Sequence, residues 1–145
     1  MRIDTFDIEF KDCVHEQPNV TFIHNGSPTY GFRFRKLVSS FGSLIEWLKD
    51  YHQYLDMPPR RMWIIEEGIS VFISCELIEA NETKIQHLGN FSVGDDWDGE
   101  AFSFIAPIKS VMKAVYQSVR TYYDSHRTWF GNSFVDVKWD DFDCR

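Results

Sequence analysis

The sequence predicts an α+β fold, with a mainly antiparallel sheet of about six to eight strands and two α-helices packed on one face. Most segments alternate apolar and polar residues, as strands do, and short connections join them. Two longer segments instead place apolar residues every three or four positions, as helices do. Neither a repeat nor a linker-like stretch interrupts the 145 residues, so residues 1–145 are predicted to form a single domain.

The N-terminal third favours three strands joined by tight turns. Apolar and polar residues alternate over residues 5–11, which predicts a strand with one buried face. A second strand is predicted over residues 19–24. The segment 25–28 (Asn-Gly-Ser-Pro) is predicted to turn the chain, because Asn and Gly tolerate positive φ. The third strand places aromatic residues on one side: Tyr30, Phe32 and Phe34.

Helical spacing begins at Leu37 and continues to Leu55, which predicts a helix with an apolar stripe facing the sheet. The pair Pro58-Pro59 is predicted to end this helix, since proline lacks the N–H that a helix interior needs. Two strands are predicted next, over residues 62–65 and 69–77, joined by a tight turn. In the second of them Cys75 alternates with aliphatic residues, which predicts a core position.

The C-terminal half contains a second helix and a loop rich in acidic residues. Strands near 83–88 and 101–105 are predicted to flank this loop. Pro107 suits the first turn of the following helix. The helix is predicted to bury Ile108, Val111, Met112, Val115, Val119 and Tyr122. Gly131-Asn132 is predicted to stop the helix, and residues 134–139 to form a last short strand.

Composition and charge restrict the possible partners. The net charge is −7, and a negative surface repels the phosphates of nucleic acids while attracting basic proteins. No apolar run approaches the roughly 20 residues that span a bilayer. The three cysteines are widely spaced, and the N-terminus lacks the layout of a signal peptide. We therefore expect a cytoplasmic protein with no nucleic acid or membrane partner.

Acidic residues occur together with tryptophan in two segments, residues 95–100 and 136–143. An aromatic ring surrounded by carboxylates is typical of a surface that anchors a basic protein. We therefore predict these partner-binding residues: Asp95, Asp96, Trp97, Asp98, Glu100, Trp139, Asp140 and Asp141. The alternative for the first segment is a solvated turn. The alternative for the second is an edge strand with a solvated chain end.

No motif in the sequence indicates catalysis, a metal or a cofactor. The acidic loop departs from a calcium-binding loop, because Gly94 and Ile105 stand where that loop needs carboxylates. The histidines lack metal-binding spacing, and His52 and His126 are explained by their places near helix ends, where a cation is favoured. Cys13-Val14-His15 lacks an orienting residue. A basic group near the first helix could instead bind an anion or a nucleic acid: Arg33, Arg35, Lys36, Arg60 and Arg61.

The order of elements resembles that of small bacterial immunity proteins of polymorphic toxin systems. The likeness rests on the N-terminal strands, the segment Phe41-Gly42-Ser43-Leu44-Ile45-Glu46-Trp47-Leu48, the hairpin that starts Met62-Trp63-Ile64-Ile65, and a long helix from Pro107 to His126. This resemblance implies a cytoplasmic protein that binds and neutralises a toxin domain. It carries no catalytic residues over to this chain.

The favoured hypothesis is a non-enzymatic binding protein that inhibits a toxin through an acidic, aromatic surface. One alternative is a small-molecule-binding or enzymatic domain with an aromatic-lined pocket between sheet and helices. Another is a self-associating structural subunit of a phage or bacterium. The sequence leaves the oligomeric state open.

Overall fold

The computed structural model describes residues 3–53, 60–66, 69–79 and 88–137. Within these ranges it contains seven strands in two antiparallel sheets, of order β1-β2-β3 and β4-β5-β6-β7. The strands are β1 Phe6–Val14, β2 Gln17–His24, β3 Ser27–Arg33, β4 Arg60–Glu66, β5 Ile69–Glu79, β6 Leu88–Asp95 and β7 Gly99–Pro107. This confirms the predicted α+β class, and the strands are divided between two sheets.

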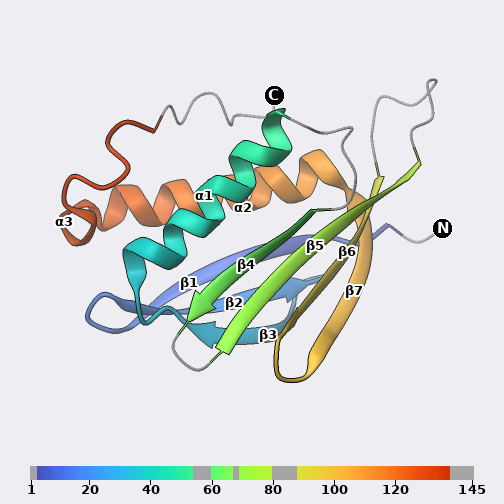
Figure 1. Cartoon of the computed structure of the whole chain (residues 1–145), viewed down its shortest axis with the longest axis horizontal. Helices are drawn as coiled ribbons and strands as arrows, with labels where there is room; N and C mark the ends of the chain where they lie inside the picture. The colour runs from blue at the N-terminus through green and yellow to red at the C-terminus, as the bar shows by residue number, and fades with distance from the viewer. Residues whose placement is uncertain (1–2, 54–59, 67–68, 80–87, 138–145) are drawn as a thin grey trace.

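The two main helices lie next to each other on the same side of the sheets (Figure 1). Helix α1 spans Leu37–Gln53 and contacts β4, whereas α2 spans Ile108–Ser125 and contacts β1. A short helix, α3 (Arg127–Phe130), follows α2. The N–H of Asp4 donates to the carbonyl of Ile105 at 2.7 Å, which joins the start of β1 to the end of β7. No helix in the described residues is both long and apolar enough to cross a membrane.

The first sheet follows the predicted pattern closely. Asn25 and Gly26 have φ values of 52° and 80°, so they form the predicted tight turn between β2 and β3. Ser27 and Pro28, predicted as part of the turn, already belong to β3. Phe34 lies just after β3 and is fully buried.

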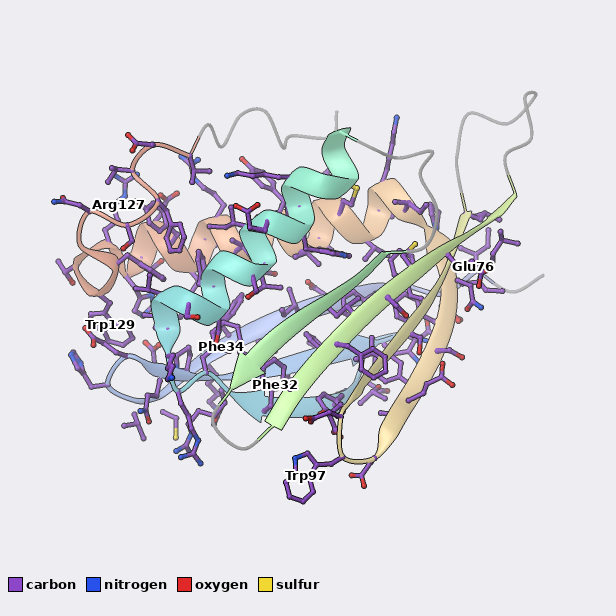
Figure 2. The ribbon with its side chains drawn as sticks, in the orientation of Figure 1. Phe32, Phe34, Glu76, Trp97, Arg127 and Trp129 are labelled. Carbon is purple, nitrogen blue, oxygen red and sulfur yellow. The ribbon has the colours of Figure 1, made fainter. Side chains whose placement is uncertain are left out.

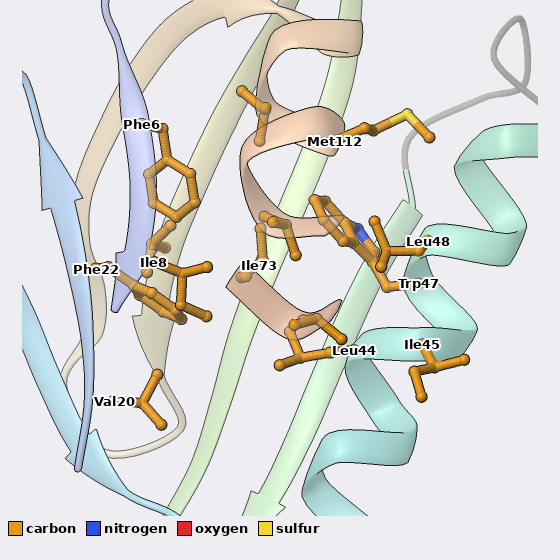
Figure 3. Close-up of a cluster of buried hydrophobic side chains, with 14 of the residues drawn as sticks. Phe6, Ile8, Val20, Phe22, Leu44, Ile45, Trp47, Leu48, Ile73 and Met112 are labelled. Carbon is orange, nitrogen blue, oxygen red and sulfur yellow. The ribbon is translucent and has the colours of Figure 1, made fainter. Parts of the chain in front are cut away.

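One continuous hydrophobic core joins both sheets and both main helices (Figure 3). Aromatic stacking links the sheets directly. The ring of Phe104 on β7 stacks on Phe6 of β1 and on Phe91 of β6, with ring centroids 5.0 Å apart in each pair. Helix α1 contributes Leu44 and Trp47 to the same core. The aromatic residues of the sequence therefore fill much of this core, between the sheets around Phe104 and between the helices around Phe41.

Helix α2 buries the stripe that its periodicity predicts, together with Tyr123. The spacing of these residues places them on the side of the helix that faces the core. Pro107 is the N-cap residue of α2, one position before the first turn where we expected it. The helix ends at Ser125, and Gly131 ends α3 with a φ of 57°.

Strand β6 lies further along the chain than its sequence pattern predicts. We expected a strand near residues 83–88, most of which lie outside the described residues, but the structure has a strand over Leu88–Asp95. Gly89 and Gly94 weaken the strand pattern of this segment, because glycine is unusual inside a strand. A Cβ at Gly89 would lie 2.7 Å from Cys75 Sγ and 2.9 Å from Ile108 Cγ1. Close packing of β6 against its neighbours therefore requires this glycine.

The last predicted strand is wrong for residues 134–136, which form turns after α3. Phe134 has a φ of 68°, which is incompatible with an extended strand. Its ring packs instead against Phe41, with centroids 5.5 Å apart, and lies next to Gly42 of α1. Residues 138–139 of that prediction, and the predicted helix end at Pro58-Pro59, lie outside the described residues.

Candidate functional site

The acidic loop forms the tip of the β6–β7 hairpin, and we call residues 95–100 the acidic hairpin tip. Asp95 ends β6 and pairs with Gly99, the first residue of β7. Gly99 has a φ of +74°, a conformation that other residues rarely adopt. Gly94 lies so close to the Gly99 carbonyl that a side chain there would collide with it. Two glycines thus allow the chain to reverse within a few residues.

Asp95 shapes this turn from inside the protein. Its Oδ1 accepts hydrogen bonds from the N–H groups of Trp97 (2.9 Å) and Asp98 (2.8 Å). Its Oδ2 accepts a 2.6 Å hydrogen bond from the hydroxyl of Tyr30 on β3. Only 6% of the Asp95 residue is exposed. We predicted Asp95 as a partner contact; the structure shows a largely buried carboxylate with three hydrogen-bond donors inside the protein, which hold the hairpin tip in shape.

The same contacts determine the protonation of the pair. The hydrogen bond from Tyr30, followed by that from the Asp98 N–H, lowers the pKa of the Asp95 carboxyl. Burial, and then the hydrogen bond to Asp95, raises the pKa of the Tyr30 hydroxyl. Asp95 is therefore an ionised acceptor and Tyr30 a neutral donor at neutral pH. A charged acceptor strengthens a hydrogen bond, so the contact between the sheets is a strong one.

Two further carboxylates attach the hairpin tip to neighbouring strands. The N–H of Ser70 on β5 donates to Asp96 Oδ1 at 2.9 Å, and the N–H of Asp96 donates to the Ser70 carbonyl at 3.0 Å. The hydroxyl of Ser92 on β6 donates to Glu100 Oε1 at 2.6 Å. Both acidic residues are exposed, so they support the tip and still present charge to solvent.

Trp97 is the outermost part of the tip. Figure 2 shows its side chain pointing away from the end of the hairpin, and 75% of the residue is exposed. Asp98 next to it is also exposed. Within the described part of the chain, no basic side chain forms an ion pair with Asp96, Asp98 or Glu100. The tip therefore combines a large exposed ring with carboxylates that pair with no basic side chain of the described residues.

The second predicted contact segment cannot be placed. Trp139, Asp140 and Asp141 lie outside the described residues. Their role as partner contacts stays a prediction, and the acidic hairpin tip is the part of the predicted surface that the structure defines.

Among the described residues, Cys13 and His15 have separate contacts and are not paired with each other. Cys13 Sγ lies 3.6 Å from Arg33 Nη2, whereas the ring of His15 packs against Trp129, with centroids 4.9 Å apart. Of the predicted basic group, Arg35 and Lys36 line one surface depression of about 550 Å³, together with His15 and Trp129. The structure does not describe the side chains of Arg60 and Arg61.

A cluster that sequence analysis missed joins β1 to the end of α2. Asp12 Oδ2 lies 2.7 Å from His126 Nε2, and the Tyr122 hydroxyl donates to Asp12 Oδ1 at 3.0 Å. His126 is the C-cap residue of α2, where the helix dipole favours positive charge. The position of His126 near a helix end was apparent from the sequence. Its pairing with Asp12 was not, because more than a hundred residues separate them.

The described residues contain no group of three or more His, Cys, Asp or Glu side chains placed to hold a metal ion. No protein-family model, curated protein or solved structure matches this chain. Its function must therefore be inferred from the geometry and charge of its own surface.

Proposed function

We propose that this protein is a non-enzymatic binding protein that uses the acidic hairpin tip to hold a basic partner, in the manner of an immunity-type inhibitor. The observation that supports this proposal is the 75% exposed Trp97 between the exposed carboxylates of Asp96 and Asp98. A tryptophan at the centre of a protein interface commonly supplies a large share of the binding energy.

The internal bonds of the tip favour tight binding. Asp95 holds the turn through two backbone N–H groups, and Asp96 holds it to β5. Binding therefore has to order little of this loop, which keeps the entropic cost of association low. Since the carboxylates of Asp98 and Glu100 are exposed, they would attract a basic partner from a distance and raise the rate of association.

The partner that best suits this surface is a basic toxin domain that acts on nucleic acid. Such a domain carries positive charge because it binds phosphates, and an acidic inhibitor can compete for the same charge. In this proposal the inhibitor acts in the cytoplasm, where it neutralises the toxin before nucleic acid is damaged. The acidic C-terminal segment with Trp139 would add a second contact.

Affinity capture with matched variants tests the proposal. Wild-type protein, Trp97→Ala and Asp98→Lys are each immobilised and exposed to lysate of the native organism. Asp98 is preferred to Asp96 for the charge reversal, because the Asp96 carboxylate bonds to the Ser70 backbone. The control is Glu46→Lys, an equal charge change at an exposed position on α1. We expect a basic protein to bind wild type and the control, but neither tip variant.

Co-expression then tests inhibition. Candidate partners are the captured protein and the products of the reading frames beside this gene. We expect a toxic product whose toxicity is suppressed by the wild-type chain and by Glu46→Lys, and suppressed less by Trp97→Ala. Equal capture and equal protection by the tip variants and by wild type would remove the hairpin tip from the site.

A further inference from the structure

A groove of about 510 Å³ runs between strand β1 and helix α2, separate from the acidic hairpin tip. Its volume lies within the range of about 300–1,000 Å³ that is usual for small-molecule sites. Apolar parts of the lining come from Ile8, Phe10, Ile23, Ala114 and Tyr122. Polar parts come from Asp7, Glu9, Gln117, Ser118, Thr121, Ser125 and His126. The groove is therefore amphipathic, with apolar surface beside hydroxyl groups and carboxylates.

Asp7 is held in position at the side of the groove where β1 meets α2. Its Oδ1 accepts a 2.7 Å hydrogen bond from the N–H of Ile8 and a 3.3 Å hydrogen bond from the hydroxyl of Ser118 on α2. Both contacts use the same oxygen, so Oδ2 keeps its acceptor capacity for another group. Glu9 lies two residues further along β1 on the same side of the strand, and it also lines the groove.

The negative charge of the groove comes from two carboxylates. The described residues that line it include two carboxylates, Asp7 and Glu9, and neither lysine nor arginine. His126 at one end is already engaged, because its Nε2 lies 2.7 Å from Asp12 Oδ2. Lys11 follows Glu9 on the same face of β1 but does not line the groove. The described lining thus offers the carboxylates of Asp7 and Glu9 to a ligand and holds no lysine or arginine that would pair with them.

We infer that this groove binds an organic cation, namely a primary ammonium or guanidinium group on an apolar stem. The cationic group would lie between the carboxylates of Asp7 and Glu9, with the hydroxyls of Ser118 and Thr121 as further acceptors. The stem would cover the apolar lining from Phe10 and Tyr122. An ammonium or guanidinium group needs only such acceptors, and the described residues place no third His, Cys, Asp or Glu side chain here as a metal ligand.

Two sources can supply this chemistry: a free polyamine, or a lysine or arginine side chain of another protein. Amide NMR titrations of the full chain at low ionic strength distinguish them. The probes are putrescine, Nα-acetyl-arginine amide, and the uncharged analogue butane-1,4-diol. We expect saturable shifts at amides of residues 7–10 and 114–122 with at least one cation and none with the diol. Tighter binding of putrescine would indicate a free polyamine, and tighter binding of the arginine derivative a protein side chain.

Isosteric variants test the role of the carboxylates. Asp7→Asn with Glu9→Gln removes both charges and keeps the Asp7 oxygen that accepts from Ile8 and Ser118. We expect it to weaken cation binding by about five- to tenfold at low salt, where exposed charges interact most strongly. The control, Glu46→Gln with Glu76→Gln, changes the net charge equally at exposed positions outside both the groove and the hairpin tip and should titrate like wild type.

Three results would overturn the inference: no saturable shifts with either cation, equal shifts with the diol, or unchanged binding in the Asp7→Asn/Glu9→Gln variant. The groove and the hairpin tip share no residue. The groove variant is therefore expected to leave capture through Trp97 intact, and the two proposals can fail separately.

Discussion

The hydroxyl of Tyr30 donates a 2.6 Å hydrogen bond to the carboxylate of Asp95, and this contact ties the three-stranded sheet to the tip of the β6–β7 hairpin. The same carboxylate accepts the N–H groups of Trp97 and Asp98. The buried Asp95 carboxylate therefore connects the core of the fold to the segment that carries the exposed Trp97.

Replacing Tyr30 with Phe tests the strength of this connection. The variant removes one hydrogen bond to a buried carboxylate, and we expect it to lower the free energy of unfolding by about 1–2 kcal/mol. Urea denaturation followed by circular dichroism measures the change. Tyr123→Phe serves for comparison, because that hydroxyl meets a neutral carbonyl at 3.5 Å and should contribute less. An equal loss in both variants would show that the charge of Asp95 adds nothing.

Acid should weaken the hairpin tip through Asp95. The hydrogen bond from Tyr30 keeps the pKa of this carboxyl below its ordinary value of 3.8, so the folded state binds its proton less readily than the unfolded state does. The resulting stability is present above pH 3.8 and is lost as the pH falls through the lower, folded-state pKa. Below pH 5, the unfolding free energy of wild type should fall more steeply with decreasing pH than that of Asp95→Asn. The difference in slope should correspond to about one bound proton. Equal slopes would contradict this assignment.

The pair of Asp12 and His126 should couple β1 to the end of α2. The ring nitrogens of His126 lie 3.0 Å from the Tyr122 carbonyl and 2.7 Å from Asp12 Oδ2, and both of these oxygens are acceptors. A double-mutant cycle of Asp12→Ala and His126→Ala should give a coupling free energy of about 0.5–1 kcal/mol, because Asp12 is half exposed and solvent screens the pair.

That coupling should decrease in high salt if it is electrostatic. A coupling of zero at low salt would mean that the two residues are near each other without stabilising the fold.

Gly89 should not tolerate a larger residue. A Cβ there would approach Cys75 Sγ to 2.7 Å and Ile108 Cγ1 to 2.9 Å, so Gly89→Ala should lower the unfolding free energy by about 1–3 kcal/mol. Gly31→Ala is the matched control, because the nearest atom to its added Cβ lies 3.6 Å away. We expect that variant to stay within about 0.5 kcal/mol of wild type in thermal or urea unfolding. A comparable loss at both positions would show that the close contacts of Gly89 are not the cause.

The sequence predicted those parts of the fold whose signal lies within a single segment. Alternation identified β1 because one face of that strand is buried and the other is wet. Helical spacing identified the buried stripe of α2 for the same kind of reason. The cluster of acids around Trp97 was also visible, since composition alone marks it.

Tertiary structure decided which of these acids faces solvent and which is buried. Asp95 and Asp98 look alike in the sequence, yet the first is enclosed by Tyr30 and the second is exposed. Strand β6 was not predicted, because its glycines are required by close contacts with β5, β7 and α2 that the sequence does not reveal. The groove between β1 and α2, and the contact between Asp12 and His126, arise from segments far apart in the chain. The hydrophobic periodicity of a segment is a local property of the sequence. The burial of a side chain and its hydrogen-bond partners depend instead on which distant segments pack against it.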